Sequence, residues 1–409
     1  MDRRRSDKAM MKKPELLAPA GDLNRCKTAI RYGADAVYIG GQSYSLRSRA
    51  SNFTMEDIKE ACEFARQHNA HIHVTTNVIP HEEDYEGLRE YLMKLEEYGV
   101  TAIIAASPSI MKLARECAPK LEIHCSTQMS ITNVETAKFL HEQLGLDRAV
   151  LARECSIEDI YAITKDCPVD TEAFIHGGMC VNYSGRCTLS NRMTLRDANR
   201  GGCAQSCRWQ YHVYQDDKEL NTDVLYSMGS KDLLAADYMY ELMDAGVSSL
   251  KIEGRMKSIH YVSTVSNVYR AAVDSYCEDP DNYVCKQEWI DELWKAAQRE
   301  LATGFYYQVP TEHEQLFGPR RQIPQYAFVG QVLEYDPETQ MATVQQRNNF
   351  KVGDQIEFYG PGMRHHEEVL TQLWDENGEE IEAAPHAMMI CKMKVTEPVK
   401  PLDMIRKRR

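Results

Sequence analysis

The sequence of 409 residues lacks the features of several large protein classes. It has no run of eighteen apolar residues, so no segment is predicted to cross a membrane as a helix. Its basic N-terminus is not followed by the apolar stretch of a secretory signal, and we therefore expect a cytoplasmic protein. It also has no low-complexity segment. With 43% hydrophobic and 27% charged residues, the composition is that of a globular chain.

An excess of positive charge is also missing, because the formal net charge is −13. This balance argues against a uniformly basic nucleic-acid binder, although local patches matter more than the total. Both termini are basic, and we predict an N-terminal arm at residues 1–13 and a C-terminal tail at 401–409. Such segments are either solvated ends or arms that hold phosphate backbones.

From residue 14 to about 255, short apolar runs alternate with amphipathic helical patterns. Eight such repeats predict an α/β fold with a (β/α)8 TIM-type barrel. A doubly wound open sheet is the alternative, but the chain lacks the glycine-rich phosphate loop typical of that fold. The predicted strands cover residues 15–21, 36–41, 71–77, 102–107, 122–128, 149–154, 172–177 and 249–255.

The domain boundaries follow from changes in composition. We expect the barrel domain at residues 14–305, with a cysteine-rich insertion at 178–230 after the seventh strand. Residues 306–325 are rich in proline, glycine and polar side chains and are predicted to be a linker. From 326 to 400, short alternating patterns separated by turn residues predict a small all-β barrel domain.

Four of the thirteen cysteines, Cys180, Cys187, Cys203 and Cys207, lie in one segment that is poor in aliphatic residues. Disulfides suit a reducing compartment poorly. A structural zinc site usually has two closely spaced pairs, and only the last two cysteines fit that rule. An iron–sulfur cluster takes four thiolates and tolerates wider loops. The spacing leaves zinc and cluster open, while the position at the active face of a barrel favours a cofactor that takes part in chemistry.

Polar residues stand at the ends of several predicted strands, and catalytic groups of TIM-type barrels gather at the C-terminal ends of the strands. Histidine suits proton transfer near neutral pH, and the arginine guanidinium binds carboxylates through two hydrogen bonds. The candidate catalytic residues are His124, His176 and Glu253. The candidate substrate-binding residues are Arg47, Arg49, Asn77, Gln128, Arg153 and Arg255.

The segment EAFIHGGMCVNYSGRCTLS at residues 172–190 resembles the signature of the family long labelled peptidase U32. One departure is Gly178, where the family usually has serine or alanine. ELLAPAGD, AVYIGG and SLKIEGRMKS are also similar to this family, as is the C-terminal β-domain. The matching signature residues are Glu172, Phe174, Gly177, Cys180, Gly185, Cys187 and Ser190.

The resemblance implies a function and a cofactor. Members of this family are implicated in oxygen-independent hydroxylation of tRNA uridine 34, of a ribosomal RNA cytidine and of the ubiquinone ring. They carry a [4Fe–4S] cluster, which implies that Cys180, Cys187, Cys203 and Cys207 are its ligands here. One barrel with one β-domain is most similar to the tRNA uridine 5-hydroxylase branch. That branch implies prephenate and the tRNA anticodon loop as partners, and we also expect an oligomer with a second copy or a paralogue.

Other functions stay open at this point. The family label suggests a peptidase, but the chain has neither a Gly-x-Ser-x-Gly nucleophile motif nor a His-Glu-x-x-His zinc motif. A single cysteine with His124 or His176 as its base would be needed instead. The same cluster chemistry on a ribosomal RNA cytidine or a quinone ring is a further alternative. So is a non-catalytic RNA-binding factor with a structural metal.

Overall fold

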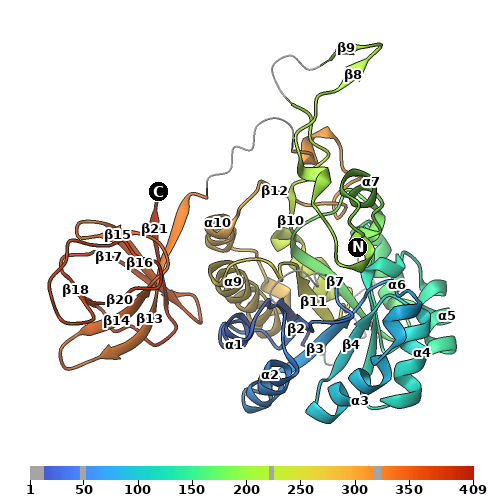
Figure 1. Cartoon of the computed structure of the whole chain (residues 1–409), viewed down its shortest axis with the longest axis horizontal. Coiled ribbons are helices and arrows are strands. Elements are labelled where there is room, and N and C mark those ends of the chain that lie inside the picture. Colours follow the sequence, from blue (N-terminus) through green and yellow to red (C-terminus); the bar gives the residue numbers. More distant parts are fainter. Residues whose placement is uncertain (1–12, 47–51, 221–224, 317–323) are drawn as a thin grey trace.

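The computed structural model describes residues 13–46, 52–220, 225–316 and 324–409. They form a parallel barrel and a separate all-β domain beside it, as Figure 1 shows. Within these residues no helix is both long and apolar enough to span a membrane.

Eight parallel strands close the barrel. β11 (Ser249–Ile252) pairs with both β1 (Glu15–Pro19) and β7 (Asp170–Gly177), so the barrel has no open seam. This closure confirms the TIM-type barrel and is incompatible with a doubly wound sheet. The strands between are β2 (Ala36–Gly40), β3 (His71–Thr76), β4 (Ala102–Ala105), β5 (Glu122–Cys125) and β6 (Arg148–Val150).

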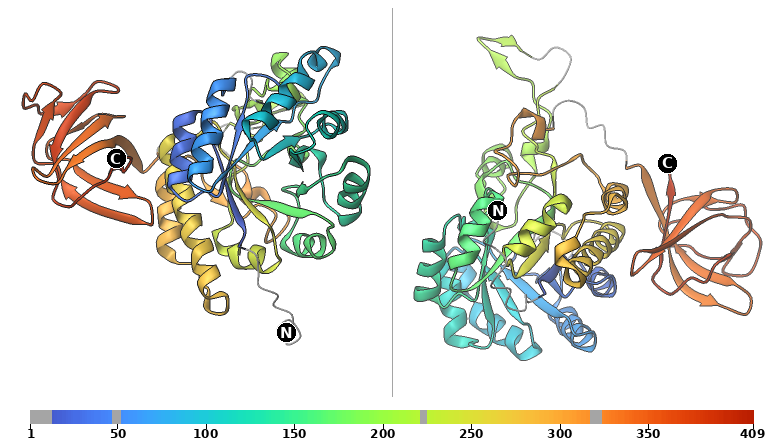
Figure 2. Two further views of the ribbon diagram at one scale, coloured as in Figure 1. Left: turned by 90° about the horizontal axis from the view of Figure 1, so that it is seen from below. Right: turned by 180° about the vertical axis from the view of Figure 1, so that it is seen from behind.

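Helices pack around the outside of the barrel, as the view from below in Figure 2 shows. Several start at side-chain caps encoded in the sequence. At α2 the hydroxyl of Thr54 accepts from the Asp57 amide, and the Asp57 carboxylate accepts from the Thr54 amide. The helices are α1 (Leu23–Arg31), α2 (Met55–Gln67), α3 (Leu88–Tyr98), α4 (Pro108–Cys117), α5 (Val134–Leu144), α6 (Ile157–Asp166), α8 (Met239–Asp244), α9 (Ile259–Glu278) and α10 (Gln287–Ala296).

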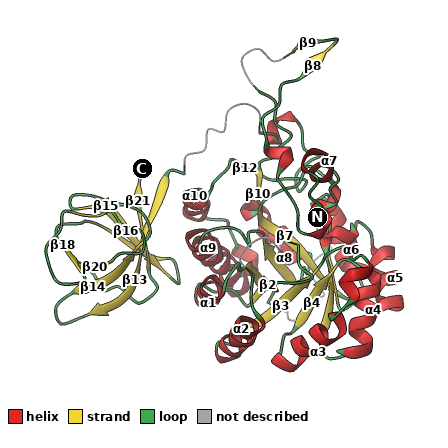
Figure 3. Cartoon of the chain, viewed as in Figure 1, coloured by secondary structure: helices red, strands yellow, loops and turns green. Residues whose placement is uncertain are grey.

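The cysteine-rich insertion follows β7 and contains one short helix, α7 (Leu189–Thr194). Beyond it, β8 (Tyr214–Gln215) and β9 (Lys218–Glu219) form a hairpin that projects from the barrel (Figure 3). The chain then returns through β10 (Asp232–Leu234), which pairs antiparallel with β7. β12 (Leu301–Ala302) extends this edge by pairing with β10.

The C-terminal domain has its own apolar core, which includes Val344, Phe358 and Met393. Seven strands form its main sheet in the order β17-β16-β21-β13-β14-β20-β18, and β15 (Phe350–Lys351) pairs with β19 (Ala383–Ala384). The seven are β13 (Tyr326–Asp336), β14 (Met341–Gln346), β16 (Gln355–Gly360), β17 (Arg364–Val369), β18 (Leu373–Asp375), β20 (Ile390–Lys394) and β21 (Met404–Arg408).

Two predicted boundaries are wrong. Residues 401–409 are not a solvated tail, because β21 pairs with β13 on one side and β16 on the other. The predicted linker at 306–325 belongs to the barrel through Leu316. Tyr306 is buried with its hydroxyl on the Phe174 carbonyl, and the Leu316 amide donates to the Gly229 carbonyl. Of the predicted arm at 1–13, only Lys13 is among the described residues, and it pairs with Asp274.

The two domains meet around a buried arginine. Arg406 on β21 is 0% exposed, and its Nη2 lies 2.7 Å from an oxygen of Glu292 on α10. Its Nε lies 2.9 Å from an oxygen of Glu357 on β16. Beside this ion pair, Nδ1 of His260 lies 2.6 Å from the Tyr359 hydroxyl. Lys295 of α10 lies 3.2 Å from Glu292 and 3.1 Å from Glu357, so it and Arg406 together balance one carboxylate from each domain.

Replacing Arg406 with leucine should weaken the fold, because Glu292 and Glu357 would lose their main counter-charge while buried. Removing one partner of a buried ion pair costs about 3–5 kcal/mol. Urea unfolding of the full chain measures this loss. The matched control is Lys407→Ala on the same strand, whose partly exposed pair with Asp354 should cost about 1 kcal/mol or less. Equal losses for the two variants would contradict a special role for Arg406.

Candidate functional site

Beneath the cavity described below, the interior of the barrel contains a cluster of buried charged side chains. Glu172 on β7 is fully buried between Arg148 on β6, at 3.3 Å, and Lys251 on β11, at 2.7 Å. Burial raises the pKa of Glu172, but the two cations outweigh it and hold this pKa at about 2. Lys251 also lies over the ring of Tyr38, and both residues reach the floor of the cavity above.

A cavity of about 370 Å³ opens at the C-terminal ends of the barrel strands. The insertion covers its mouth, and we call residues 178–209 the cysteine strap. Polar contacts hold the strap in place. Glu154, after β6, accepts from the amide and the hydroxyl of Ser184 at 2.7 and 2.9 Å. The side chain of Asn199 bonds both the amide and the carbonyl of Cys187.

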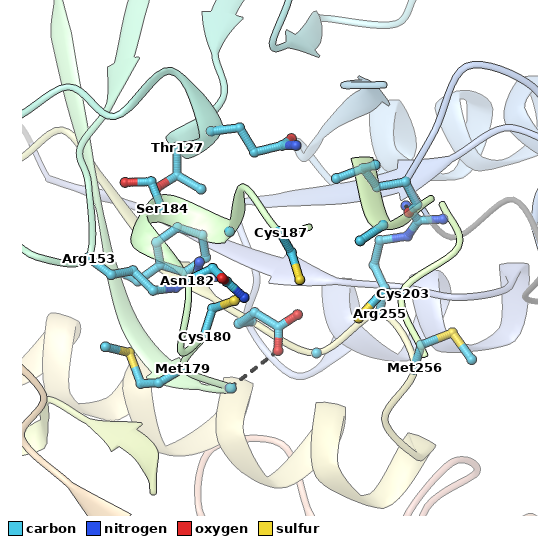
Figure 4. Close-up of a pocket in the computed structure, with 18 of the residues that line it drawn as sticks. Thr127, Arg153, Met179, Cys180, Asn182, Ser184, Cys187, Cys203, Arg255 and Met256 are labelled. Carbon is cyan, nitrogen blue, oxygen red and sulfur yellow. Dashed lines mark hydrogen bonds between the residues drawn. The ribbon is translucent and has the colours of Figure 1, made fainter. Parts of the chain in front are cut away.

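All four cysteines of the strap line this cavity, and none forms a disulfide. Figure 4 shows Cys180, Cys187 and Cys203 turned toward the same space, between Arg153 and Arg255. In a zinc site with Zn–S distances of about 2.3 Å, tetrahedral geometry puts the sulfurs about 3.8 Å apart. Among the described residues, no three cysteine sulfurs lie within 4.8 Å of one another. The quartet is therefore more open than a compact zinc site.

Two of the strap thiols, Cys180 and Cys207, are shifted toward the protonated form. Burial raises the pKa of Cys180 and of Cys207. A metal centre that bound these two residues as thiolates would therefore release protons on binding.

Three predicted site residues meet on the walls of the cavity. The Glu253 carboxylate accepts from the Gly178 amide at 3.3 Å, which places an acid beside the cysteine strap. Nδ2 of Asn77 donates to Oε1 of Gln128 at 3.2 Å. Gln128 lines the cavity, and its buried Nε2 has no hydrogen-bond partner among the described residues. It is a donor without an acceptor, which a polar ligand would satisfy.

The predicted arginines have different surroundings. Arg153 lines the cavity with its guanidinium 3.7 Å from the centre of the Phe174 ring, and within the described chain it makes no ion pair. Arg255 also lines the cavity, but it donates to Ser45 at 2.7 Å and to Asn52 at 2.6 Å. Arg255 therefore positions the segment after β2. Arg47 and Arg49 lie outside the described residues.

The predicted catalytic histidines are not at the cavity. His124 points into the barrel interior, where its ring packs edge-on against His73, and burial holds its pKa well below the usual range. His176 should face inward by strand alternation. The pairing of β7 with β11 shifts register there, and His176 instead contacts Tyr269 of α9 at 3.2 Å. Neither side chain lines the cavity, so the prediction that they transfer protons at the barrel mouth is wrong.

The sequence did not predict a group of cations that lies on the cavity wall. Arg208, Lys257 and Arg299 all line the cavity and share one buried carboxylate, Asp232. Burial raises the pKa of Asp232, but these three cations outweigh it and keep this pKa below its usual value. Three cations on one anion leave this wall positive. The only sequence signal was the position of Arg208 directly after Cys207.

The buried histidines should make stability depend on pH. Burial lowers the pKa of His176 to about 3, so the unfolded state binds the proton first as the pH falls below 6.5. Stability is therefore lost from pH 6.5 downward, by about 2 kcal/mol for this histidine at pH 5. In urea unfolding at pH 7 and pH 5, His176→Phe should remove about that part of the decline. The exposed control His313→Gln should retain it, and an unchanged decline in His176→Phe would contradict the assignment.

Comparisons with known proteins agree with this architecture. The profile of peptidase family U32 matches residues 21–316, and that of the U32 C-terminal domain matches 324–406. The chain is 49% identical to tRNA hydroxylation protein P1 of Bacillus subtilis, over 98% of this chain and 96% of that protein. It is 40% identical to the 23S rRNA 5-hydroxycytidine C2501 synthase of Escherichia coli, over 65% of this chain and 40% of that protein. It is 31% identical to a collagenase of Porphyromonas gingivalis, over 96% of this chain and 97% of that protein. The chain belongs to peptidase family U32.

Proposed function

We propose that this protein is a tRNA-modifying enzyme that hydroxylates C5 of uridine 34 without molecular oxygen. The proposal depends on an iron–sulfur cluster and on prephenate as co-substrate. The observation that carries it is the convergence of four unpaired cysteines on one cavity at the barrel mouth. Similarity along almost the whole chain to a protein named for tRNA hydroxylation supports the same class of reaction. Such a reaction fits a cytoplasmic enzyme.

The strap suits a [4Fe–4S] cluster held by Cys180, Cys187, Cys203 and Cys207. The thiols are free, and their sulfurs are more widely spaced than zinc requires. An iron–sulfur core is larger than a single ion and is bound by four thiolates. When bound, it would supply redox or Lewis-acid capacity that no side chain has.

The cavity also suits a small dicarboxylate such as prephenate. Arg153 offers a guanidinium that is not engaged in an ion pair within the described chain, and guanidinium binds carboxylate through two parallel hydrogen bonds. Nε2 of Gln128 offers a second donor, and the wall around Asp232 is positive. A volume of about 370 Å³ lies within the range of small-molecule sites. Prephenate therefore fits the charge and the size of the site.

Glu253 is the best candidate for proton transfer at the substrate. Its carboxylate lines the cavity beside the strap and is oriented by the Gly178 amide. A uridine in an anticodon loop is single-stranded, so it can be splayed into the cavity without melting a duplex. The chain's own contribution is then to hold the base, orient the dicarboxylate and exclude water.

The peptidase alternative has weaker support in the geometry. A cysteine nucleophile needs a base within hydrogen-bond reach, and His124 and His176 both lie away from the strap. No histidine lines the cavity among the described residues. Proteolysis is favoured by names alone, those of the family and of relatives such as the collagenase. Association with a second copy or a paralogue stays a prediction.

Nucleosides of total tRNA test the proposed reaction. In a strain that lacks the gene and any paralogue, mass spectrometry should find that 5-hydroxyuridine and its derivatives are lost. The wild-type gene should restore them, and Cys187→Ser should not, because one cluster ligand is missing. The matched control is Cys277→Ser, an exposed thiol outside the strap, which should restore them fully. Persistence of the modification in the deletion strain would overturn the proposal.

Metal analysis tests the cofactor independently of the reaction. Protein purified without oxygen should be brown and contain iron and inorganic sulfide in equal amounts. The double variant Cys203→Ser/Cys207→Ser should lose both elements, and Cys391→Ser in the β-domain core should keep them. A colourless wild-type protein with one zinc ion per chain would contradict the cluster and favour a structural metal site.

A further inference from the structure

The cysteine strap differs in charge from the rest of the chain. Residues 178–209 contain five arginines, one aspartate, no lysine and no glutamate, which is a net charge of +4 in a chain with a net charge of −13. Anion-binding surfaces of acidic proteins are local concentrations of this kind. The strap is therefore a local positive segment that suits a partner with negative charge.

The arginines of the strap fall into two groups. Arg200 pairs with Asp84 at 2.9 Å, and Arg208 faces Asp232, so both help to hold the strap. Arg186, Arg192 and Arg196 form no ion pair within the described chain, and the first two are exposed. These three are left for a ligand outside the chain.

Large apolar side chains stand exposed among these arginines. Tyr183 is 56% exposed, Met193 is 45% exposed and Leu195 is 94% exposed. Leu195 has a φ of +54°, in the left-handed region, where its amide ends α7 by bonding the Asn191 carbonyl. Glycine is the usual residue at such a position. A leucine held there in solvent points to a role for its side chain in binding a partner.

This surface adjoins the cavity. Asn182, Ser184 and Gly185 line the cavity on either side of Tyr183, and Cys187 follows Arg186 directly. Leu189 and Ser190, in the first turn of α7, also line it, and Arg192 lies in the next turn. The exposed side chains of the strap thus lie close in the chain to residues that line the cavity.

We propose that the outer face of the strap is the docking surface for a single-stranded RNA loop. Arg186 and Arg192 hold phosphates on both sides of the base that enters the cavity, and Tyr183 stacks on a neighbouring base. Leu195 contacts the loop through its apolar side chain. Arginine binds phosphate through two hydrogen bonds, and aromatic rings stack on any base. The inference rests on the proposed function, because it assigns the RNA to this same site.

Binding of RNA to the full-length, cluster-loaded protein tests the assignment without any turnover. The probe is a fluorescein-labelled RNA hairpin that reproduces an anticodon stem and loop, followed by anisotropy at several salt concentrations. Arg186→Gln/Arg192→Gln should lower the slope of log affinity against log salt by about 1.4, because each single-stranded phosphate contact contributes about 0.7. Tyr183→Ala should weaken binding about 5- to 100-fold at every salt concentration. The iron content of each variant shows that the strap is intact.

The matched control is Lys392→Gln/Lys394→Gln on β20, which removes two exposed cations from the β-domain. It should leave both the affinity and the salt slope unchanged. A slope that falls with the β-domain variant and not with the strap variant would overturn the proposal and place the RNA on the β-domain. Wild-type binding that is equally tight to a blunt duplex without a loop would also overturn it. A strap variant that fails to associate with a second protein copy while binding RNA normally would assign the surface to an oligomer.

Failure of this inference is distinguishable from failure of the proposed function. Loss of 5-hydroxyuridine in the deletion strain together with normal RNA binding by the strap variants would retain the function and reject the docking surface. Tight binding that depends on the strap, with the modification unchanged in the deletion strain, would retain the surface and reject uridine 34 as the site of reaction.

Discussion

A series of buried ion pairs links the strands where the barrel closes. These pairs fix the strand register, and the position of the site depends on that register. Lys251, Glu172, Arg148 and Glu15 follow one another across β11, β7, β6 and β1. A buried carboxylate such as Glu172 is tolerated only while both of its cationic partners are in place. Four strands must therefore meet in one register. That register carries the polar ends of the strands to a common rim, where the cavity opens.

The strap above the rim is held by polar contacts rather than by apolar packing. It has few apolar side chains to bury, and its shape depends on polar contacts such as those of Glu154 with Ser184 and of Asn199 with Cys187. Each contact of this kind contributes only about 1 kcal/mol. A metal centre bound by four thiolates would stabilise the strap more than these contacts together, because the free energy of metal binding adds to the free energy of folding. The four cysteines and the entrance to the cavity are thus parts of one element.

The periodicity of apolar residues was sufficient to predict the barrel, because strand and helix patterns are set by residues close together in the sequence. It also placed Glu253, Arg153, Asn77 and Gln128 correctly at the cavity. It failed for His176, because strand alternation does not reveal the change in register between β7 and β11 that turns this side chain toward α9.

Other failures have their causes in tertiary structure. His124 looked like a strand-end group, yet it lies one layer below the rim. The basic residues at 401–409 were predicted to be a C-terminal tail. No local sequence pattern shows that Arg406 pairs with Glu292 and Glu357, which are distant in the chain. Pairings between residues this distant in sequence are beyond pattern analysis. The cations around Asp232 were missed for the same reason, since they come from separate segments.

The domain interface also has a consequence for the order of folding during synthesis. Arg406 is made 114 residues after Glu292, its partner on α10. The barrel therefore emerges from the ribosome while the Glu292 carboxylate is still hydrated. This face of α10 becomes buried only when β21, the last strand of the β-domain, has folded against it. Docking of the two domains is thus a late step, and a nascent chain would expose the faces around Tyr32 and Ile259 until β21 arrives with Met404.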